Sequence, residues 1–175
     1  ESSLKIRSLT ILQPNMNIGD IDSLVNLEVL SMEGSLKKDL DISIFKFLKY
    51  LNCVYSTRLR NLEIAFSLKH LSLSGFKMDD LSIMRNLKLL ESVALYNTHI
   101  KSLYGIGNLI NLKKVLIDKA PKLKNLCGFT EQNSNMETVE VFNAKNLRDI
   151  IALKYLHNLK TLYLQRISDI ETLSF

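Results

Sequence analysis

An apolar triplet recurs eight times along this 175-residue chain, with two residues between its first and second members and one between its second and third. The first members are 21, 21, 20, 22, 22, 24 and 23 residues apart. So regular an interval predicts stacked units that pack on their neighbours rather than around one central core. The triplets are Ile6/Leu9/Ile11, Leu27/Leu30/Met32, Leu48/Leu51/Cys53, Leu68/Leu71/Leu73, Leu90/Val93/Leu95, Leu112/Val115/Ile117, Met136/Val139/Val141 and Leu159/Leu162/Leu164.

Each unit combines two hydrophobic periods. Around the triplet the period is two, which predicts a short strand with one buried face. After it the period is three, as in Met78, Leu81, Met84 and Leu87, which predicts a tight 3₁₀-like return. Weaker periodicity predicts longer loops at Lys37–Ile44 and Thr130–Asn135, with a short helix in the second.

The units that begin at Leu68 and Leu90 resemble the 22-residue leucine-rich repeats of protein-phosphatase-1 regulators and bacterial internalins, LxxLxLxxNxIxxIxxLxxLxx. The units that begin at Leu112 and Met136 resemble the 23–24-residue form of plant immune receptors and F-box proteins. This resemblance covers nearly the whole chain. It implies an α/β solenoid: a right-handed superhelical arc with a parallel sheet on its concave face and short 3₁₀ or helical returns on its convex face. We expect residues 1–175 to form a single array of about eight repeats and, because neither end has a polar cap, to be part of a longer protein.

The ninth position of each repeat departs from the family pattern. An Asn side chain there normally hydrogen-bonds the backbone of adjacent turns. Ser and Thr can replace it, whereas Ala, Phe and Ile cannot. We therefore expect water or altered loop geometry to satisfy those backbone groups, with irregular curvature and strain in the later repeats. The ninth residues are Pro14, Ser35, Ser56, Phe76, Thr98, Ala120, Ala144 and Ile167.

Strand alternation places the third, fifth and seventh positions of each repeat on the concave face. Repeats five to eight bring four large side chains there beside two carboxylates, a composition typical of protein-binding hot spots. A second group lies on repeats three and four and includes Val54. The alternative is that these side chains only cover one another across strands. The predicted partner-binding residues are Tyr50, Tyr55, His70, Tyr96, Leu116, Asp118, Glu140, Phe142 and Tyr163.

The charge pattern favours a solvated exterior over a nucleic-acid surface. The chain has 23 Lys and Arg against 18 Asp and Glu, a net charge of +5, and its lysines are spread along most of its length. One local basic run stands out, which indicates either an anion-binding patch or a solvated rim. Its members are Lys113, Lys114, Lys119, Lys122 and Lys124.

The sequence lacks the patterns of catalytic, metal and cofactor sites. The three histidines lie in different repeats without a cysteine or carboxylate at ligand spacing. Gly105-x-Gly107 lacks a third glycine and a following Lys-Ser/Thr, so it indicates a turn. The two cysteines, Cys53 and Cys127, are expected to be free. No signal peptide or spanning segment is visible, which favours a cytoplasmic protein without a membrane partner.

These features predict a non-catalytic module that binds a protein partner on its concave face, within a larger adaptor, sensor or scaffold. The alternative is a regulatory subunit of a phosphatase or a bacterial effector. Nucleic-acid binding is less favoured, and an enzyme would need catalytic residues in flanking segments.

Overall fold

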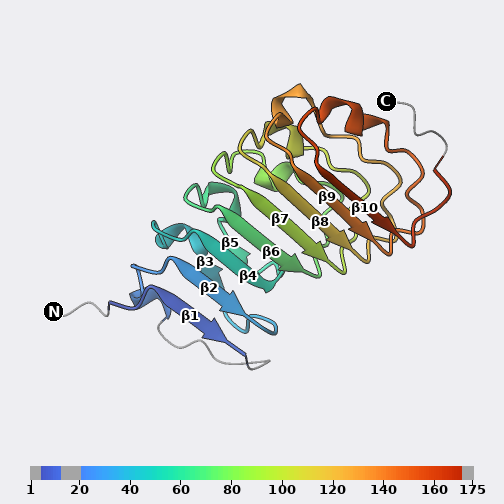
Figure 1. Cartoon of the computed structure of the whole chain (residues 1–175). Coiled ribbons are helices and arrows are strands. Elements are labelled where there is room, and N and C mark those ends of the chain that lie inside the picture. Colours follow the sequence, from blue (N-terminus) through green and yellow to red (C-terminus); the bar gives the residue numbers. More distant parts are fainter. Residues whose placement is uncertain (1–4, 13–20, 171–175) are drawn as a thin grey trace.

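The chain forms the predicted solenoid. The computed structural model describes residues 5–12 and 21–170, so Pro14 of the ninth-position row lies outside the described residues. Eight strands form one parallel sheet in the order β1-β2-β4-β6-β7-β8-β9-β10, which is also their order along the chain. Figure 1 shows these strands side by side, with the returns stacked behind them. They are β1 (Ser8–Ile11), β2 (Val29–Met32), β4 (Tyr50–Val54), β6 (His70–Ser74), β7 (Ser92–Tyr96), β8 (Lys114–Asp118), β9 (Thr138–Phe142) and β10 (Thr161–Gln165).

The triplets form the core. All three members are buried in every repeat from the second to the seventh. In the first and last described repeats, by contrast, Ile6 is 38% and Leu162 is 37% exposed. This difference follows from the architecture, because a solenoid unit buries its apolar residues only between two neighbouring units.

The returns contain only short elements in the described part of the chain. The segment Lys37–Ile44, expected to be a loop, holds a strand and a 3₁₀ turn, and its strand pairs with another in a second, two-stranded parallel sheet. The segment Thr130–Asn135 contains the expected short helix, closed by reciprocal hydrogen bonds between Thr130 and Asn133. The elements are β3 (Leu40–Asp41), β5 (Leu59–Arg60), η1 (Ile21–Ser23), η2 (Ile42–Ile44), η3 (Leu62–Ile64), η4 (Ser82–Met84), η5 (Ile106–Asn108), η6 (Glu131–Asn133) and η7 (Ile151–Tyr155).

The eighth position turns the chain out of the sheet. It has a positive φ in six repeats, and in four of them its N–H continues the ladder of the sheet, as in Asn97 N to Asp118 O at 2.9 Å. Backbone groups at the strand ends are thus paired without an Asn at the ninth position. The eighth residues with positive φ are Gly34, Gly75, Asn97, Lys119, Asn143 and Arg166.

Side-chain ladders occur at two other places. At the ninth position the Thr98 hydroxyl donates to Phe76 O at 3.1 Å, so threonine does replace asparagine there. Elsewhere the residue directly before a triplet donates to a carbonyl of the preceding repeat, which ties successive returns together. These bonds are Ser67 Oγ to Leu48 O (2.9 Å), Asn111 Nδ2 to Lys88 O (2.8 Å), Asn135 Nδ2 to Ile110 O (2.9 Å) and Asn158 Nδ2 to Ser134 O (2.6 Å).

Candidate binding surface

The three outward rows of the sheet are aligned as predicted. Tyr50 on β4 is level with His70 on β6, and Leu116 on β8 is level with Glu140 on β9. Along β6 to β9, outward side chains alternate with fully buried ones. Neighbouring strands of a sheet lie about 4.8 Å apart, so each row presents one side chain at that interval.

In repeats five to eight, the structure brings two of the predicted aromatic residues together. The ring centroids of Phe142 and Tyr163 are 5.1 Å apart with the planes tilted by 36°, and Tyr163 is 48% exposed. Tyr96 shares the seventh-position row with Phe142 but lies two strands away, with Asp118 between them. The result is a half-buried surface with two aromatic centres rather than one continuous cluster.

The two carboxylates of this region have different partners. Glu140 accepts from Lys114 Nζ at 2.8 Å, so its charge is compensated. Asp118 accepts from the neutral amide of Asn143 at 2.6 Å, and the described residues provide it with no ion pair. Asp118 therefore keeps a negative charge on the concave face between Tyr96 and Phe142.

The second predicted group divides into two parts. Tyr50 and His70 lie on the concave face with ring centroids 6.2 Å apart, and His70 Nδ1 is 2.9 Å from Ser92 Oγ. Tyr55 instead follows β4 and packs edge-on against the buried ring of Phe76 at 4.9 Å. Burial raises the pKa of Tyr55.

Between the two groups the sheet presents small side chains. A Cβ added to Gly75 would have no heavy atom within 4 Å, so the surface there is open. Ser72, Ser74 and Ala94 occupy the neighbouring outward positions on β6 and β7. This arrangement leaves room for a protruding group of a partner.

A ladder of charges follows the second position of the repeats, just before the strands, and the sequence analysis missed it. Glu28 accepts from Arg7 at 2.9 Å and from Lys49 at 2.6 Å. The signal was present in the sequence, but it becomes visible only when the second positions are read as a column. We call this column the second-position ladder: Arg7, Glu28, Lys49, Lys69, Glu91, Lys113, Glu137 and Lys160.

Glu91 is the central acid of this ladder. It accepts from Lys113 at 2.8 Å and from Lys69 at 3.1 Å. The hydrogen bond from Lys113 makes the largest contribution, with that from Lys69 next, and together with the two positive charges they lower the pKa of Glu91 to about 2. Ion pairs thus neutralise Lys113 and Lys114 of the predicted basic run, whereas its other three lysines form no ion pair with the described residues.

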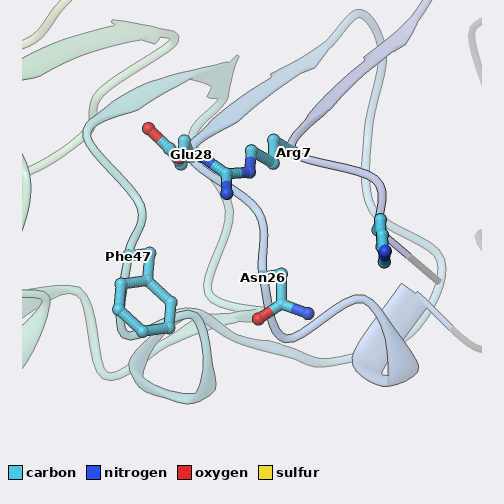
Figure 2. A pocket seen from close by; sticks show the side chains of 5 residues that line it. Arg7, Asn26, Glu28 and Phe47 are labelled. Atoms are coloured by element: carbon cyan, nitrogen blue, oxygen red, sulfur yellow. Dashed lines mark hydrogen bonds and ion pairs between the residues drawn. The ribbon is translucent and has the colours of Figure 1, made fainter. Parts of the chain in front are cut away.

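A hollow of about 600 Å³ lies at the N-terminal end of the ladder, lined by Lys5, Arg7, Asn26, Glu28 and Phe47. Figure 2 shows the Arg7 and Glu28 side chains reaching toward each other, with the Phe47 ring and the Asn26 amide near the turns that precede the strands. The hollow combines a positive rim with an exposed aromatic ring.

Metal-binding groups are not assembled in the described part of the chain. It contains no group of three or more His, Cys, Asp or Glu residues that could hold a metal ion. Burial raises the pKa of Cys53 to about 12, so this thiol is not a nucleophile near neutral pH. The described residues also include no helix long and apolar enough to cross a membrane.

Comparison with known proteins gives a likeness of fold. No protein-family model and no curated protein matches the chain. Among solved structures, an internalin of Listeria monocytogenes has a TM-score of 0.53 and 20% identity over 95% of this chain and 57% of that chain. A leucine-rich-repeat protein of Leptospira interrogans has a TM-score of 0.42 and 17% identity, covering 93% of this chain and 62% of that one. The plant peptide hormone receptor RGFR1, in complex with RGF2, has a TM-score of 0.38 and 14% identity, covering 84% and 33%.

The chain spans less than two thirds of the length of each of these structures. The repeated triplets, the parallel sheet that they build and the fold shared with the internalin together identify the chain as a leucine-rich-repeat solenoid.

Proposed function

We propose that this solenoid is a non-catalytic recognition module that binds a protein partner on its concave face, within a larger adaptor, sensor or scaffold. The observation that carries the proposal is the partly exposed aromatic surface on β7 to β10. Tyrosine and similar large side chains supply most of the binding energy at protein interfaces because they bury much area at little entropic cost.

The charge of this surface indicates the chemistry of the partner. Asp118 lies between Tyr96 and Phe142 without an ion pair among the described residues. A basic side chain of the partner would form an ion pair with Asp118, while apolar groups beside it cover the rings of Tyr96 and Phe142. The open surface around Gly75 accommodates a part of the partner that protrudes into the arc.

The stacking of Phe142 on Tyr163 also supports a purely structural role for these two residues. Tyr163 nevertheless remains 48% exposed beside the Phe142 ring. We therefore assign Tyr163 to the binding surface, with Phe142 supporting it and contributing its own edge.

Site-specific photo-cross-linking in the source cells tests the proposal. A benzophenone amino acid replaces either Tyr163 on the concave face or Ile151 on η7 of the convex side; both native side chains are exposed. We expect a protein adduct from position 163 and none from position 151. Adducts from position 151 alone, or from neither position, would contradict the proposed surface.

The identity of the adduct also separates the possible roles. A phosphatase would favour a regulatory subunit, and an adduct formed only in a host-cell lysate, not in the source cells, would favour a bacterial effector. The two free thiols are consistent with our proposal of a reducing, cytoplasmic location.

A further inference from the structure

The turns that lead into the strands expose one large apolar side chain in each of five consecutive repeats. Each lies one or two residues before the first member of its triplet, and each is at least 44% exposed. The last two repeats place Asn135 and Asn158 there instead. Single exposed apolar residues are ordinary, but an aligned series marks an interaction surface. We call this series the apolar stripe: Val25, Phe47, Phe66, Leu89 and Ile110.

The turns that carry the stripe share one backbone pattern, with the apolar residue two positions before the triplet in three repeats and one position before it in two. In all five repeats, the N–H of the first triplet residue donates to the carbonyl three residues earlier, at 3.0 to 3.1 Å. Ser67 and Asn111 also bond the neighbouring turn through their side chains. One apolar side chain therefore recurs in the turn before each of these strands, and the turns repeat at about the strand spacing of 4.8 Å.

The second-position ladder runs beside the stripe and contains one break. Its charges alternate in sign everywhere except between Lys49 and Lys69, which occupy neighbouring repeats with no acid between them. Each of these lysines forms an ion pair with the repeat on its far side from the break, Lys49 with Glu28 and Lys69 with Glu91. The break lies beside Phe47 and Phe66, the two most exposed members of the stripe. An acidic group is thus missing where the apolar surface is largest.

We propose that this edge binds an acidic amphipathic α-helix of a partner protein, lying across repeats two to six. A helix advances 5.4 Å per turn, close to the spacing of the stripe, so one apolar residue per turn can contact each repeat. An extended partner repeats the same face only every 6.4 to 6.8 Å and loses register after two repeats. Phe47 and Phe66 are the anchors, and a carboxylate of the helix occupies the position between Lys49 and Lys69.

The charges of the ladder favour this occupant over two others. Five basic residues outnumber three acidic ones in the ladder, so two copies of this edge repel each other. An anionic membrane would bring its charge onto Glu28 and Glu91 as well as onto the lysines, whereas a helix places a carboxylate only at the break.

Display of a helical peptide library tests the proposal with the full chain as bait. The library fixes leucines at helical positions i, i+4, i+7 and i+11 and varies the remaining positions. We expect the selected peptides to be acidic, and to bind the double variant Phe47→Ser/Phe66→Ser at least tenfold more weakly than wild type. The control is Tyr104→Ser, which removes a 65% exposed ring outside the stripe and should leave affinity unchanged.

The charge requirement has its own matched pair of variants. Lys69→Glu should lower the affinity for the selected peptide at least threefold. Lys101→Glu makes the same change at an exposed lysine paired with Asp79, away from the ladder, and should have no effect. Circular dichroism and the urea midpoint of each variant establish that the fold is kept.

Four outcomes would overturn the inference. The first is selection of peptides without an acidic bias, and the second is equal binding of the selected peptide to wild type and to the Phe47/Phe66 variant. The third is an equal effect of Lys69→Glu and Lys101→Glu on peptide affinity. The fourth is that the wild-type chain binds phosphatidylserine vesicles or self-associates and the Phe47/Phe66 variant does not. The last outcome would assign the stripe to a membrane or to a second copy of the chain.

Discussion

The ring of Phe142 on β9 packs against that of Tyr163 on β10, with centroids 5.1 Å apart and planes tilted by 36°. In the unbound protein, this contact should stabilise the fold by about 0.5 to 1.5 kcal/mol beyond the area buried. A double-mutant cycle with Phe142→Ala, Tyr163→Ala and both changes, measured by urea unfolding, gives this coupling energy. A coupling near zero would mean that the two rings are free to meet a partner independently.

The concave face should carry most of the energy of the partner complex. We expect Tyr96→Ala and Phe142→Ala each to weaken binding by more than about 1 kcal/mol, roughly fivefold. The measurement is a titration of each variant with the purified partner protein that cross-linking identifies. Tyr104→Ala, an exposed tyrosine outside the sheet rows, is the control. Unchanged affinity of both concave variants, together with loss of binding when convex residues are substituted, would show that the partner does not bind the concave face.

Salt dependence distinguishes a protein partner from nucleic acid. A nucleic-acid ligand neutralised by six or more lysines would lose about a thousandfold in affinity between 50 and 200 mM salt. We expect a much smaller loss, because aromatic contacts and a single Asp118 ion pair dominate the proposed interface. Isothermal titration at the two salt concentrations measures the difference.

The rows of the concave face were predictable because two simple periods determine them. The triplet gives the repeat its phase, and strand alternation then places Tyr50 beside His70 and Leu116 beside Glu140. Tyr55 is predicted to share a surface with Tyr50 on repeats three and four, but it follows the strand and packs against Phe76. Side-chain packing of this kind depends on a residue 21 positions later, so local periodicity does not reveal it.

The polar ladders were harder to predict, for a different reason. The families that the repeats resemble have asparagine at the ninth position, which is where a side-chain ladder is expected from the sequence. In this chain, Asn111 and Asn135 donate side-chain hydrogen bonds to the neighbouring backbone from the position before each triplet. Glu91 pairs with Lys69 and Lys113, which lie 22 residues away on either side, so this pairing also depends on how the repeats align. None of the three charged residues is unusual within its own segment.

Two glycines with positive φ should differ sharply in their tolerance of alanine. A Cβ on Gly128 would lie 2.2 Å from Leu103 O and 2.8 Å from Tyr104 N, whereas a Cβ on Gly75 would meet nothing within 4 Å. We expect Gly75→Ala to cost about 1 to 2 kcal/mol from backbone conformation alone, and Gly128→Ala at least about 3 kcal/mol. Urea denaturation of both variants compares them, and equal losses would show that the contact with Leu103 relaxes freely.

The two thiols should react at very different rates. Cys127 is exposed, whereas Cys53 is buried and burial raises its pKa to about 12. At pH 8, we expect Ellman's reagent to modify one thiol rapidly in the native protein and the second only on unfolding in urea. Cys127→Ser should abolish the rapid phase. Rapid modification of two thiols in the native state would contradict burial of the third triplet.

Glu91 should make the stability of the solenoid depend on pH in the acid range. Its pKa is lowered from the ordinary value of 4.5 to about 2 in the folded protein, first by the hydrogen bond from Lys113 and then by that from Lys69. Because the folded pKa is the lower one, its contribution is complete above pH 4.5 and disappears as the pH falls toward 2. The stability difference between wild type and Glu91→Gln should therefore close over that interval.

Urea unfolding of the two proteins at pH 2 to 7 measures this difference, and comparison of the pair removes the effects of other acids, such as Glu28, whose pKa is also lowered. In 1 M salt, where screening extends over about 3 Å, the difference should shrink at every pH. A difference that stays constant from pH 7 to pH 2 would mean that the carboxylate of Glu91 does not bridge its two lysines in solution.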